Sequence, residues 1–464
     1  MEETLYTPIE RLENFGENKD KIIIAVQISF KSDSEEDIHE GLVELAKETS
    51  SGTWVDVTTA NAESTQADAW IVAQKGNIGY IGLPPENWDI SAGFNNVWAN
   101  IGGNYFGLYV LKKARFLDVY FPPSIVRQFP GPKFGIDGIY EHFGNMKRMI
   151  AGSIVKPKMG LSAVDWAAVA ENVFWEADLV KDDENLCNQT FCPWKDRFSE
   201  TMNRQQKIVD ETGKPKMYAH NITTRDIVGR AREVQALGDE LGAPGFSFMI
   251  DGVIAGLNAV QMVREQDDLQ HPIYIHRAMH GALTRGQDFG MTFLVWAKMF
   301  RMAGADYLHT GTYGSGKMGE REEMDDVLLQ EEPEEMPIHL LDSTMYLNRW
   351  LTKKWEHLKP VLPMASGGLF PGALPRIRRF NNAIGNSFQI GCNAGGGIHG
   401  HPEGTRVGAR SFEEVTEIVE TDEYQALMND DESARIDYLV NYASQPGKEY
   451  LKWAFDRKEW GILV

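Results

Sequence analysis

Eight short apolar stretches decide the fold: SIVKPK (153–158), ADLVKDD (177–183), KMYAHN (216–221), GFSFMID (245–251), PIYIHRA (272–278), ADYLHTG (305–311), VLPMASGG (361–368) and SFQIGCNAGGG (387–397). Segments long enough for helices separate them. Strands that alternate regularly with helices form parallel sheets, and eight such units close into a barrel. The sequence therefore predicts an α/β protein with a (β/α)8 barrel in its C-terminal part.

Polar residues gather at the carboxyl ends of these predicted strands. Barrels of this type carry their active sites there, in the loops that lead from strand to helix. A single polar residue at a strand end is typical of a cap or a loop, but recurrence at nearly every end indicates a functional site. The residues are Lys156, Lys158, Lys181, Asp183, Glu184, His220, Asn221, Asp251, His276, Arg277, His309, residues 366–368 and residues 395–397.

The part of the chain before the barrel has a mixed pattern. The apolar run from Ile22 to Phe30 predicts a strand, and Ser34 is a candidate cap for the helical pattern that follows it. A chain of 464 residues is too long for a single core. We expect a ferredoxin-like α+β domain over residues 1–137 and the barrel domain over residues 138–464.

Composition limits the classes of function. The net charge of -21 disfavours nucleic acid and anionic membranes as partners, because like charges repel. No apolar run of about 18 residues occurs and the first residues are polar, so we expect a cytoplasmic protein without a membrane span or a secretory signal. Cys187, Cys192 and Cys392 have no CxxC spacing, which argues against a disulfide framework or a structural zinc site.

The most informative stretch for chemistry is KDDEN at residues 181–185. In an extended strand Lys181 and Asp183 share a face, and the following turn can bring Glu184 beside them. Two carboxylates are hard oxygen ligands suited to Mg²⁺. A free ammonium would repel the metal, whereas a lysine that has added CO2 becomes a carbamate and a third anionic ligand. A solvated charged loop remains the alternative at this point.

Other strand ends add candidate acids, bases and phosphate ligands. Lys156 and Lys158, projecting to one side, would depress each other's pKa and suit proton transfer near neutrality. At the fifth strand Arg277 can grip a phosphate while His276 orients it or moves a proton. Each of these residues also has an ordinary structural interpretation.

Two glycine-rich features complete the pattern. GTYGSGKM (311–318) is not a Walker motif because Met318 follows Lys317, and it is typical of a hinged lid that brings a charge to the reacting centre. SGG at 366–368 and GGG at 395–397 follow the last two strands, where this fold often binds phosphate through backbone N–H groups. Tight turns would explain the same glycines.

The motifs KPKMGLS (156–162), LVKDDEN (179–185) and HRAMH (276–280) resemble the large subunit of ribulose-1,5-bisphosphate carboxylase/oxygenase, over nearly the whole chain. This resemblance implies that Lys181 is carbamylated by an activator CO2 and holds Mg²⁺ with Asp183 and Glu184. It also implies proton transfer by Lys156 and stabilisation of the carboxylated transition state by Lys317.

The resemblance further assigns substrate contacts. On the barrel these are Lys158, His276, Arg277, His309, Ser366, Gly367, Gly368, Gly395 and Gly396. On the N-terminal domain they are Glu48, Thr53, Trp54 and Asn104, which in this family complete the active site of a neighbouring subunit. We therefore expect a homodimer with shared active sites.

Departures from the plant-type pattern favour an archaeal form between the second and third forms of the family. The lid is one residue longer than the plant-type GTVVGKL, and Ile154 replaces a threonine. Such enzymes work without small subunits, as dimers or rings of dimers such as a decamer. Their ribulose 1,5-bisphosphate serves nucleotide-sugar (AMP) metabolism or CO2 fixation, and O2 competes with CO2 as an oxygenase reaction.

Two rival functions are less favoured. A carboxylase-like enolase or isomerase of sugar phosphates usually loses several active-site residues that this chain keeps, among them Lys156, Lys181 and Lys317. A non-catalytic sugar-phosphate-binding protein would keep the glycine loops but not the acidic KDDE stretch.

Overall fold

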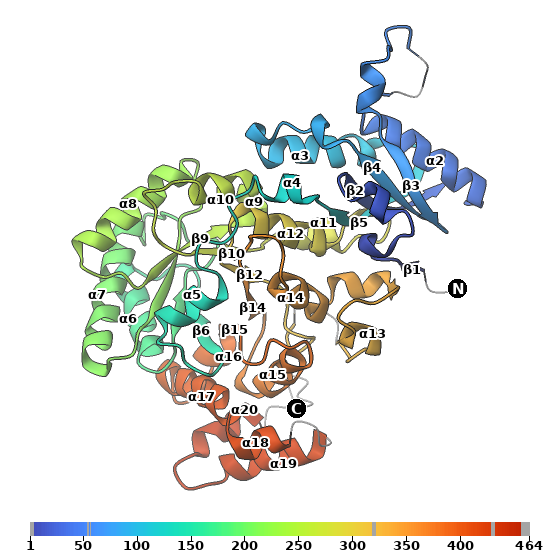
Figure 1. The fold of residues 1–464 in the computed structure, drawn as a ribbon. Coiled ribbons are helices and arrows are strands. Elements are labelled where there is room, and N and C mark those ends of the chain that lie inside the picture. The colour runs from blue at the N-terminus through green and yellow to red at the C-terminus, as the bar shows by residue number, and fades with distance from the viewer. Residues whose placement is uncertain (1–3, 53–54, 56, 318–321, 428–431, 456–464) are drawn as a thin grey trace.

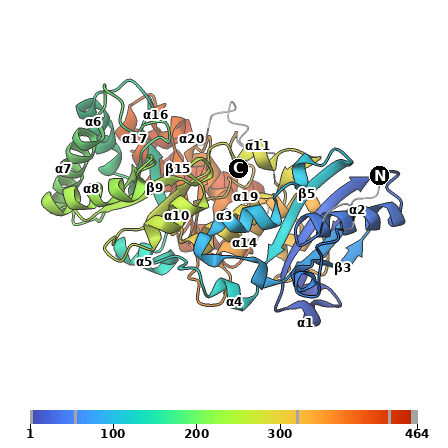
Figure 2. The ribbon, with the colours of Figure 1, turned by 90° about the horizontal axis from the view of Figure 1, so that it is seen from above.

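The computed structural model describes residues 4–52, 55, 57–317, 322–427 and 432–455. It consists of an N-terminal sheet and a closed barrel (Figure 1). Seen from above, the sheet lies to one side of the barrel (Figure 2). None of the described helices combines the length and apolar character needed to cross a membrane.

The N-terminal part has the order expected of a ferredoxin-like domain. Its elements are β2 (Ile22–Phe30), α2 (Glu35–Glu48), β3 (Trp70–Lys75), β4 (Ile78–Leu83), α3 (Phe94–Ile101) and β5 (Leu111–Tyr120). The strands lie side by side as β5-β2-β4-β3, and each neighbouring pair is antiparallel. Ser34 caps α2 by accepting a hydrogen bond from the N–H of Asp37. Such a cap is stabilising because the N–H groups of the first turn have no acceptor within the helix. The predicted α+β domain is confirmed.

The barrel is built from parallel strands that come from the eight predicted stretches. The strands are β6 (Ile150–Ile154), β7 (Leu179–Lys181), β8 (Met217–Asn221), β9 (Phe246–Asp251), β10 (Ile273–His276), β12 (Tyr307–His309), β14 (Leu362–Ser366) and β15 (Gly391–Ala394). They pair in this order, and β15 closes the barrel against β6. The main helices between and after them are α6 (Ala163–Phe174), α7 (Trp194–Thr212), α8 (Ile227–Glu240), α10 (Leu257–Arg264), α12 (Phe293–Ala303), α14 (Thr344–Thr352), α15 (Leu374–Ala383) and α17 (Thr405–Ile418). The (β/α)8 prediction is confirmed.

A helix closes the amino end of the barrel. Buried side chains of α5 (Gly135–His142), including Ile136 and Ile139, pack in one cluster with the strand residues Ile150 and Leu179. The opposite, carboxyl end is therefore the end at which a substrate can enter, as is general for this fold.

Short elements join the two parts. Strand β11 (Phe289–Met291) leaves the barrel region and pairs in parallel with β5, which extends the N-terminal sheet. Strand β13 (Met336–Pro337) pairs with β1 (Leu5–Tyr6). In the described part of the acidic segment 320–335, Glu332 lies 2.7 Å from Arg11, so the segment packs on the N-terminal part.

The remaining helices are short or C-terminal. They are α1 (Phe15–Asn18), α4 (Pro123–Val126), α9 (Gly252–Ala255), α11 (His280–Thr284), α13 (Asp326–Leu329), α16 (Gly396–His399), α18 (Asp422–Ala426), α19 (Glu432–Ala443) and α20 (Lys452–Phe455). The domain boundary between residues 137 and 138 stays a prediction. It falls within α5, whose contacts with the barrel favour a boundary a few residues earlier.

Candidate active site at the carboxyl end of the barrel

Lys181 is the last residue of β7 and is completely buried. Its Nζ donates a hydrogen bond of 2.5 Å to the carbonyl oxygen of Asp182. Burial lowers the pKa of the Lys181 ammonium, although the negative charges of Glu184 and Asp183 act in the opposite direction. The neutral amine, which is the nucleophilic form, is thus populated at a lower pH than in an exposed lysine.

Two carboxylates flank this lysine. Asp183 Oδ2 lies 3.0 Å from Lys156 Nζ, and Asp183 Oδ1 accepts a hydrogen bond of 2.9 Å from the Asn185 amide. Burial raises the pKa of Asp183, but the hydrogen bond from Asn185 and the charge of Lys156 outweigh it, and the net shift is downward. Glu184 Oε2 lies 3.6 Å from His276 Nε2. Lys156 thus contacts Asp183, and the neighbouring Glu184 approaches His276 at the end of the fifth barrel strand, β10.

The donor set at this place is incomplete for a metal ion. Among the described residues, no three His, Cys, Asp or Glu side chains lie together in a way that could hold one. Asp183 and Glu184 supply two hard anionic oxygen donors of the kind that Mg²⁺ prefers. They fit a magnesium site if Lys181 supplies a third.

Histidines line the neighbouring strands. His276 Nδ1 lies 3.0 Å from Asp251 Oδ2, and the His276 and His309 rings pack edge to face at 4.8 Å between centroids. Burial and the charge of Lys181 lower the pKa of His276. Burial and the neighbouring His276 lower the pKa of His309 well below that of a free imidazole. Both rings therefore favour the neutral state.

Tyr274 supports His309 from inside the barrel. The Asn393 amide nitrogen donates to the Tyr274 hydroxyl at 2.6 Å, and this hydroxyl lies 2.6 Å from His309 Nε2. Because the hydroxyl accepts from the amide, its own proton is free for Nε2, which leaves Nδ1 as the protonated nitrogen of the neutral ring. Sequence reasoning missed Tyr274 and Asn393, since inward-pointing polar residues within a strand have no local signal.

Arg277 follows β10 and stacks on an aromatic ring. Its guanidinium carbon lies 4.4 Å from the centroid of the Phe293 ring. Burial lowers the pKa of Arg277 to about 10, against the opposing charges of Asp342 and Glu322. The side chain still carries a positive charge at neutral pH, in a place where that charge is poorly solvated and suited to an anion.

The lid lysine lies beside the loop after β14. The N–H of Lys317 donates a hydrogen bond of 3.0 Å to the carbonyl oxygen of Gly367. A Cβ at Gly368 would come within 2.9 Å of Lys317 Cγ, and Gly368 has a φ of +87°, so this position requires glycine. The Lys317 side chain itself is exposed.

The glycines after the last strand lie beside Lys156. A Cβ at Gly395 would come within 2.9 Å of Lys156 Cε. Ser366, at the end of β14, and Gly395 are half-buried, and Gly396 is exposed. The loops after β14 and β15 thus reach Lys317 and Lys156 respectively.

Other predicted residues make no hydrogen bond or ion pair with this cluster among the described residues. Lys158 is exposed, and β6 ends at Ile154, so the alternation assumed for Lys156 and Lys158 does not apply beyond it. In the N-terminal domain the Asn104 amide donates to Glu48 Oε1 at 2.8 Å. Within the described ranges, this pair makes no hydrogen bond or ion pair with the barrel residues named above. Thr53 and Trp54 lie outside the described residues.

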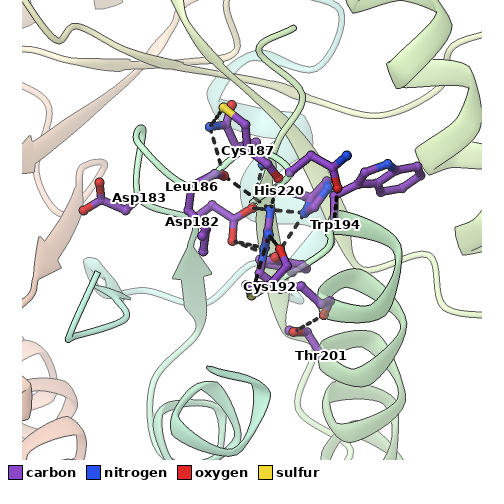
Figure 3. A network of polar contacts seen from close by, with 12 residues as sticks. Asp182, Asp183, Leu186, Cys187, Cys192, Trp194, Thr201 and His220 are labelled. Carbon is purple, nitrogen blue, oxygen red and sulfur yellow. Dashed lines mark hydrogen bonds and ion pairs between the residues drawn. The ribbon is translucent and has the colours of Figure 1, made fainter. Parts of the chain in front are cut away.

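Asp182 lies between the predicted metal ligands Lys181 and Asp183 in the chain, and its side chain belongs to a buried network. Figure 3 shows Asp182 and Asp183 pointing in opposite directions, with Asp182 directed toward His220. The Arg197 guanidinium from α7 pairs with Asp182, and both side chains are fully buried. Sequence reasoning did not assign Asp182 or Arg197, because nothing local indicates which residue of the next helix reaches the strand end.

Comparison with known proteins gives a consistent result. Residues 135–437 match the family described as "Ribulose bisphosphate carboxylase large chain, catalytic domain". Residues 13–125 match the family described as the N-terminal domain of the same large chain. The ribulose bisphosphate carboxylase of Methanocaldococcus jannaschii is 37% identical over 394 residues, which are 81% of this chain and 87% of that protein. That of Pyrococcus abyssi is 33% identical over 410 residues, covering 87% and 88%.

Solved structures extend the likeness to the fold. The octameric enzyme of Pyrococcus horikoshii matches with a TM-score of 0.76 and 29% identity, covering 100% of both chains. The dimeric archaeal enzyme of Hyperthermus butylicus matches with a TM-score of 0.71 and 29% identity, covering 93% of this chain and 96% of that one. The family profiles, the relatives and the barrel-end site agree, and the chain belongs to the ribulose bisphosphate carboxylase large-chain family.

Proposed function

We propose that this protein carboxylates ribulose 1,5-bisphosphate to two molecules of 3-phosphoglycerate. The observation that carries the proposal is the burial of Lys181 beside Asp183 and Glu184 at the open end of the barrel. A buried lysine with a lowered pKa is suited to nucleophilic addition, and two carboxylates beside it suit a divalent cation.

Activation begins at Lys181. The lone pair of its neutral Nζ forms a bond to the carbon of CO2, one C–O π pair moves to oxygen, and a proton leaves the nitrogen for water. The product is an anionic carbamate, which completes an oxygen donor set with Asp183 and Glu184. Magnesium held there would polarise the substrate ketone and stabilise negative charge on oxygen.

The substrate lies between two phosphate sites. Arg277 and His309 form one site, where a poorly solvated cation and a neutral N–H donor meet. The second site consists of backbone N–H groups in the loops after β14 and β15, at Gly367, Gly368, Gly395 and Gly396, next to Ser366. These two sites suit a sugar with a phosphate at each end.

Lysines complete the chemistry. In this proposal Lys156, whose Nζ lies 3.0 Å from Asp183, returns a proton to the carbanion released when the carbon–carbon bond breaks. Lys317 approaches from the lid and stabilises the charge that develops as CO2 adds. His276, at the end of β10, is oriented by Asp251 and contacts the substrate. Lys158 contributes positive charge near Lys156. O2 competes with CO2 for the same enediolate.

The active sites are shared within a homodimer. Glu48 and Asn104 are hydrogen-bonded to each other in the N-terminal domain, and in this proposal they serve the neighbouring subunit with Thr53 and Trp54. Exposed apolar side chains follow Asn104 in the chain, with Tyr109 fully exposed and Phe106 and Val110 exposed by 37% and 48%. An apolar surface of this kind favours a protein partner. Rings of dimers, a decamer among them, form without a small subunit.

The cellular compartment and metabolic role that we propose follow from the family to which the chain belongs. We place it in the cytoplasm, where it serves CO2 fixation or nucleotide-sugar (AMP) metabolism. The net charge of -21 agrees with a protein that binds neither nucleic acid nor an anionic membrane.

The test is incorporation of ¹⁴CO2 into 3-phosphoglycerate, with enzyme preincubated with or without bicarbonate and Mg²⁺. We expect labelled product that depends on preincubation. Unlabelled product mixtures in both arms, with ribulose 1,5-bisphosphate merely enolised, would identify a carboxylase-like enolase or isomerase. Substrate bound but unchanged would identify a sugar-phosphate-binding protein.

A further inference from the structure

We infer that Arg197 and Asp182 are positioning residues that hold the segment 181–192 in the geometry needed to bind the activating cation and CO2. The inference rests on the proposed function, because it concerns the affinity of the same site. Neither residue faces the open end of the barrel, and both act through the residues they hold.

Asp182 is surrounded by hydrogen-bond donors from two elements, α7 and β8. Arg197 of α7 donates to both of its oxygens, at 3.2 and 3.1 Å. From β8, the Tyr218 hydroxyl donates at 2.7 Å and the N–H of Asn221 at 2.9 Å, while His220 Nδ1 lies 3.0 Å away. A buried carboxylate with this many donors has one stable orientation.

Arg197 extends the same network along the loop that follows β7. Besides Asp182, its guanidinium donates to the carbonyl oxygens of Leu186, Cys187 and Cys192, at distances of 3.3, 3.1 and 3.1 Å. A planar guanidinium with five N–H donors can make these contacts at once, whereas a lysine cannot. One side chain thus fixes both the strand end and the loop of segment 181–192.

The network determines where the proposed ligands point. Asp182 lies between Lys181 and Asp183 in the chain, so fixing Asp182 restricts the backbone that carries both neighbours. Figure 3 shows Asp183 pointing away from Asp182. The carbonyl of Asp182 also accepts the Lys181 Nζ hydrogen bond. Side chains that orient metal ligands from behind change metal affinity by about 10- to 100-fold when they are altered.

A second arginine, largely buried, provides a matched control. Arg148 pairs with Asp178, which precedes β7, through two hydrogen bonds of 2.6 and 2.8 Å. This pair lies at the closed, amino end of the barrel, and within the described structure its hydrogen bonds and ion pairs involve none of residues 181–192. It shares the chemistry of the Arg197 pair but not its position.

The experiment compares wild type with Arg197→Lys and Arg148→Lys. Carbamate formation from ¹³CO2 is followed by ¹³C NMR without substrate, as Mg²⁺ is titrated, and thermal unfolding is measured in parallel. We expect Arg197→Lys to raise the half-saturating Mg²⁺ concentration by about 10- to 100-fold. Arg148→Lys should stay within about twofold of wild type, even with an equal or larger loss of thermal stability.

A milder variant keeps the test open if Arg197→Lys does not fold. Tyr218→Phe removes one hydrogen bond to Asp182 and keeps the ion pair, and should shift the Mg²⁺ midpoint about threefold. Wild-type midpoints in Arg197→Lys or Tyr218→Phe, or equal shifts in Arg148→Lys, would overturn the inference alone. A wild-type protein that forms no carbamate at any Mg²⁺ concentration would overturn the proposed function with it.

Discussion

Lys181 and Lys216 are buried lysines on neighbouring strands, at opposite ends of the barrel. Each donates its Nζ to a backbone carbonyl, of Asp182 at 2.5 Å and of Ala177 at 2.7 Å respectively. Burial lowers the pKa of both. The difference lies in their surroundings, since Lys216 is next to the end that α5 closes and Lys181 is next to the open end with two carboxylates beside it.

The comparison shows that the position of a charged side chain in the fold, rather than its residue type or burial, determines whether it contributes to stability or to chemistry. At the amino end the Arg148–Asp178 pair and the Arg264–Asp306 pair neutralise buried charges within a closed packing layer. At the carboxyl end Lys156 is about one third exposed, although it pairs with Asp183. Charges that remain near solvent and near each other are available to a substrate.

The largest expected effect is the loss of turnover when Lys181 is replaced. Lys181→Met should abolish carboxylation while preserving the fold, because methionine fills the site and carries no buried charge. Lys216→Met, its counterpart at the closed end, should keep kcat within about twofold. Both are measured by ¹⁴CO2 incorporation and by thermal unfolding. An active Lys181→Met protein would refute the carbamate assignment.

The next effect concerns the lid at the open end. Lys317→Ala should reduce carboxylation by about 10²- to 10³-fold, the usual loss when one transition-state charge partner is removed. Enolisation precedes CO2 addition, so exchange of the substrate C3 hydrogen with deuterium from solvent should continue. Proton NMR of the recovered substrate measures this exchange. Carboxylation at the wild-type rate would exclude the lid role.

At the closed end the expected effect is on stability and depends on pH. Burial raises the pKa of Asp178, but the charge and hydrogen bonds of Arg148 outweigh it and lower the pKa overall. A lowered folded-state pKa adds stability above the unfolded-state pKa of about 3.9, and this stability is lost as the pH falls through the folded value.

Asp178→Asn should therefore cost about 1–3 kcal/mol of unfolding free energy at pH 7, since it removes the two hydrogen bonds of Asp178 to Arg148 and leaves Glu413, at 3.2 Å, as the nearest carboxylate partner. The gap to wild type should shrink below about pH 4. Urea unfolding at a series of pH values measures it, and the specific activity of the folded variant at pH 7 is the control. A gap that is constant with pH would contradict the assignment of this stability to the ion pair.

The sequence predicts the barrel and much of its open end because both depend on local patterns. Apolar runs alternating with helical segments identify the strands, and residues just after a strand must lie at the same end of a parallel barrel. This is why Lys156, Asp183, Glu184 and His276 were found together.

Contacts between distant side chains could not be predicted in the same way. Arg197 reaches Asp182 from the following helix, and Tyr274 points inward to Asn393 across the barrel. Strand β11 has only three residues, one of them Gly290, and pairs with a strand more than 170 residues earlier. None of these contacts leaves a periodic or compositional trace, because each depends on side-chain direction in the folded state.

The smallest expected effect tests a contact that links the barrel interior to its open end. The Tyr274 hydroxyl lies 2.6 Å from His309 Nε2 and accepts from Asn393, from which we infer that it donates to Nε2 and that the neutral ring carries its proton on Nδ1. Tyr274→Phe removes this donor. The proton of His309 can then also lie on Nε2, so a smaller fraction of the molecules has an Nδ1–H that can donate to the phosphate. Losing one such hydrogen bond costs about 1 kcal/mol, so the KM for ribulose 1,5-bisphosphate should rise about fivefold with little change in kcat.

Tyr307 offers the matched control, since it stacks near Tyr274 at 5.2 Å between ring centroids and, within the described part of the chain, its hydroxyl has no hydrogen-bond partner. Tyr307→Phe removes a buried, unpaired hydroxyl and should leave KM unchanged. Initial rates over a range of ribulose 1,5-bisphosphate concentrations separate the two variants. Equal KM values in both would mean that Tyr274 supports His309 through packing alone and not through its hydroxyl.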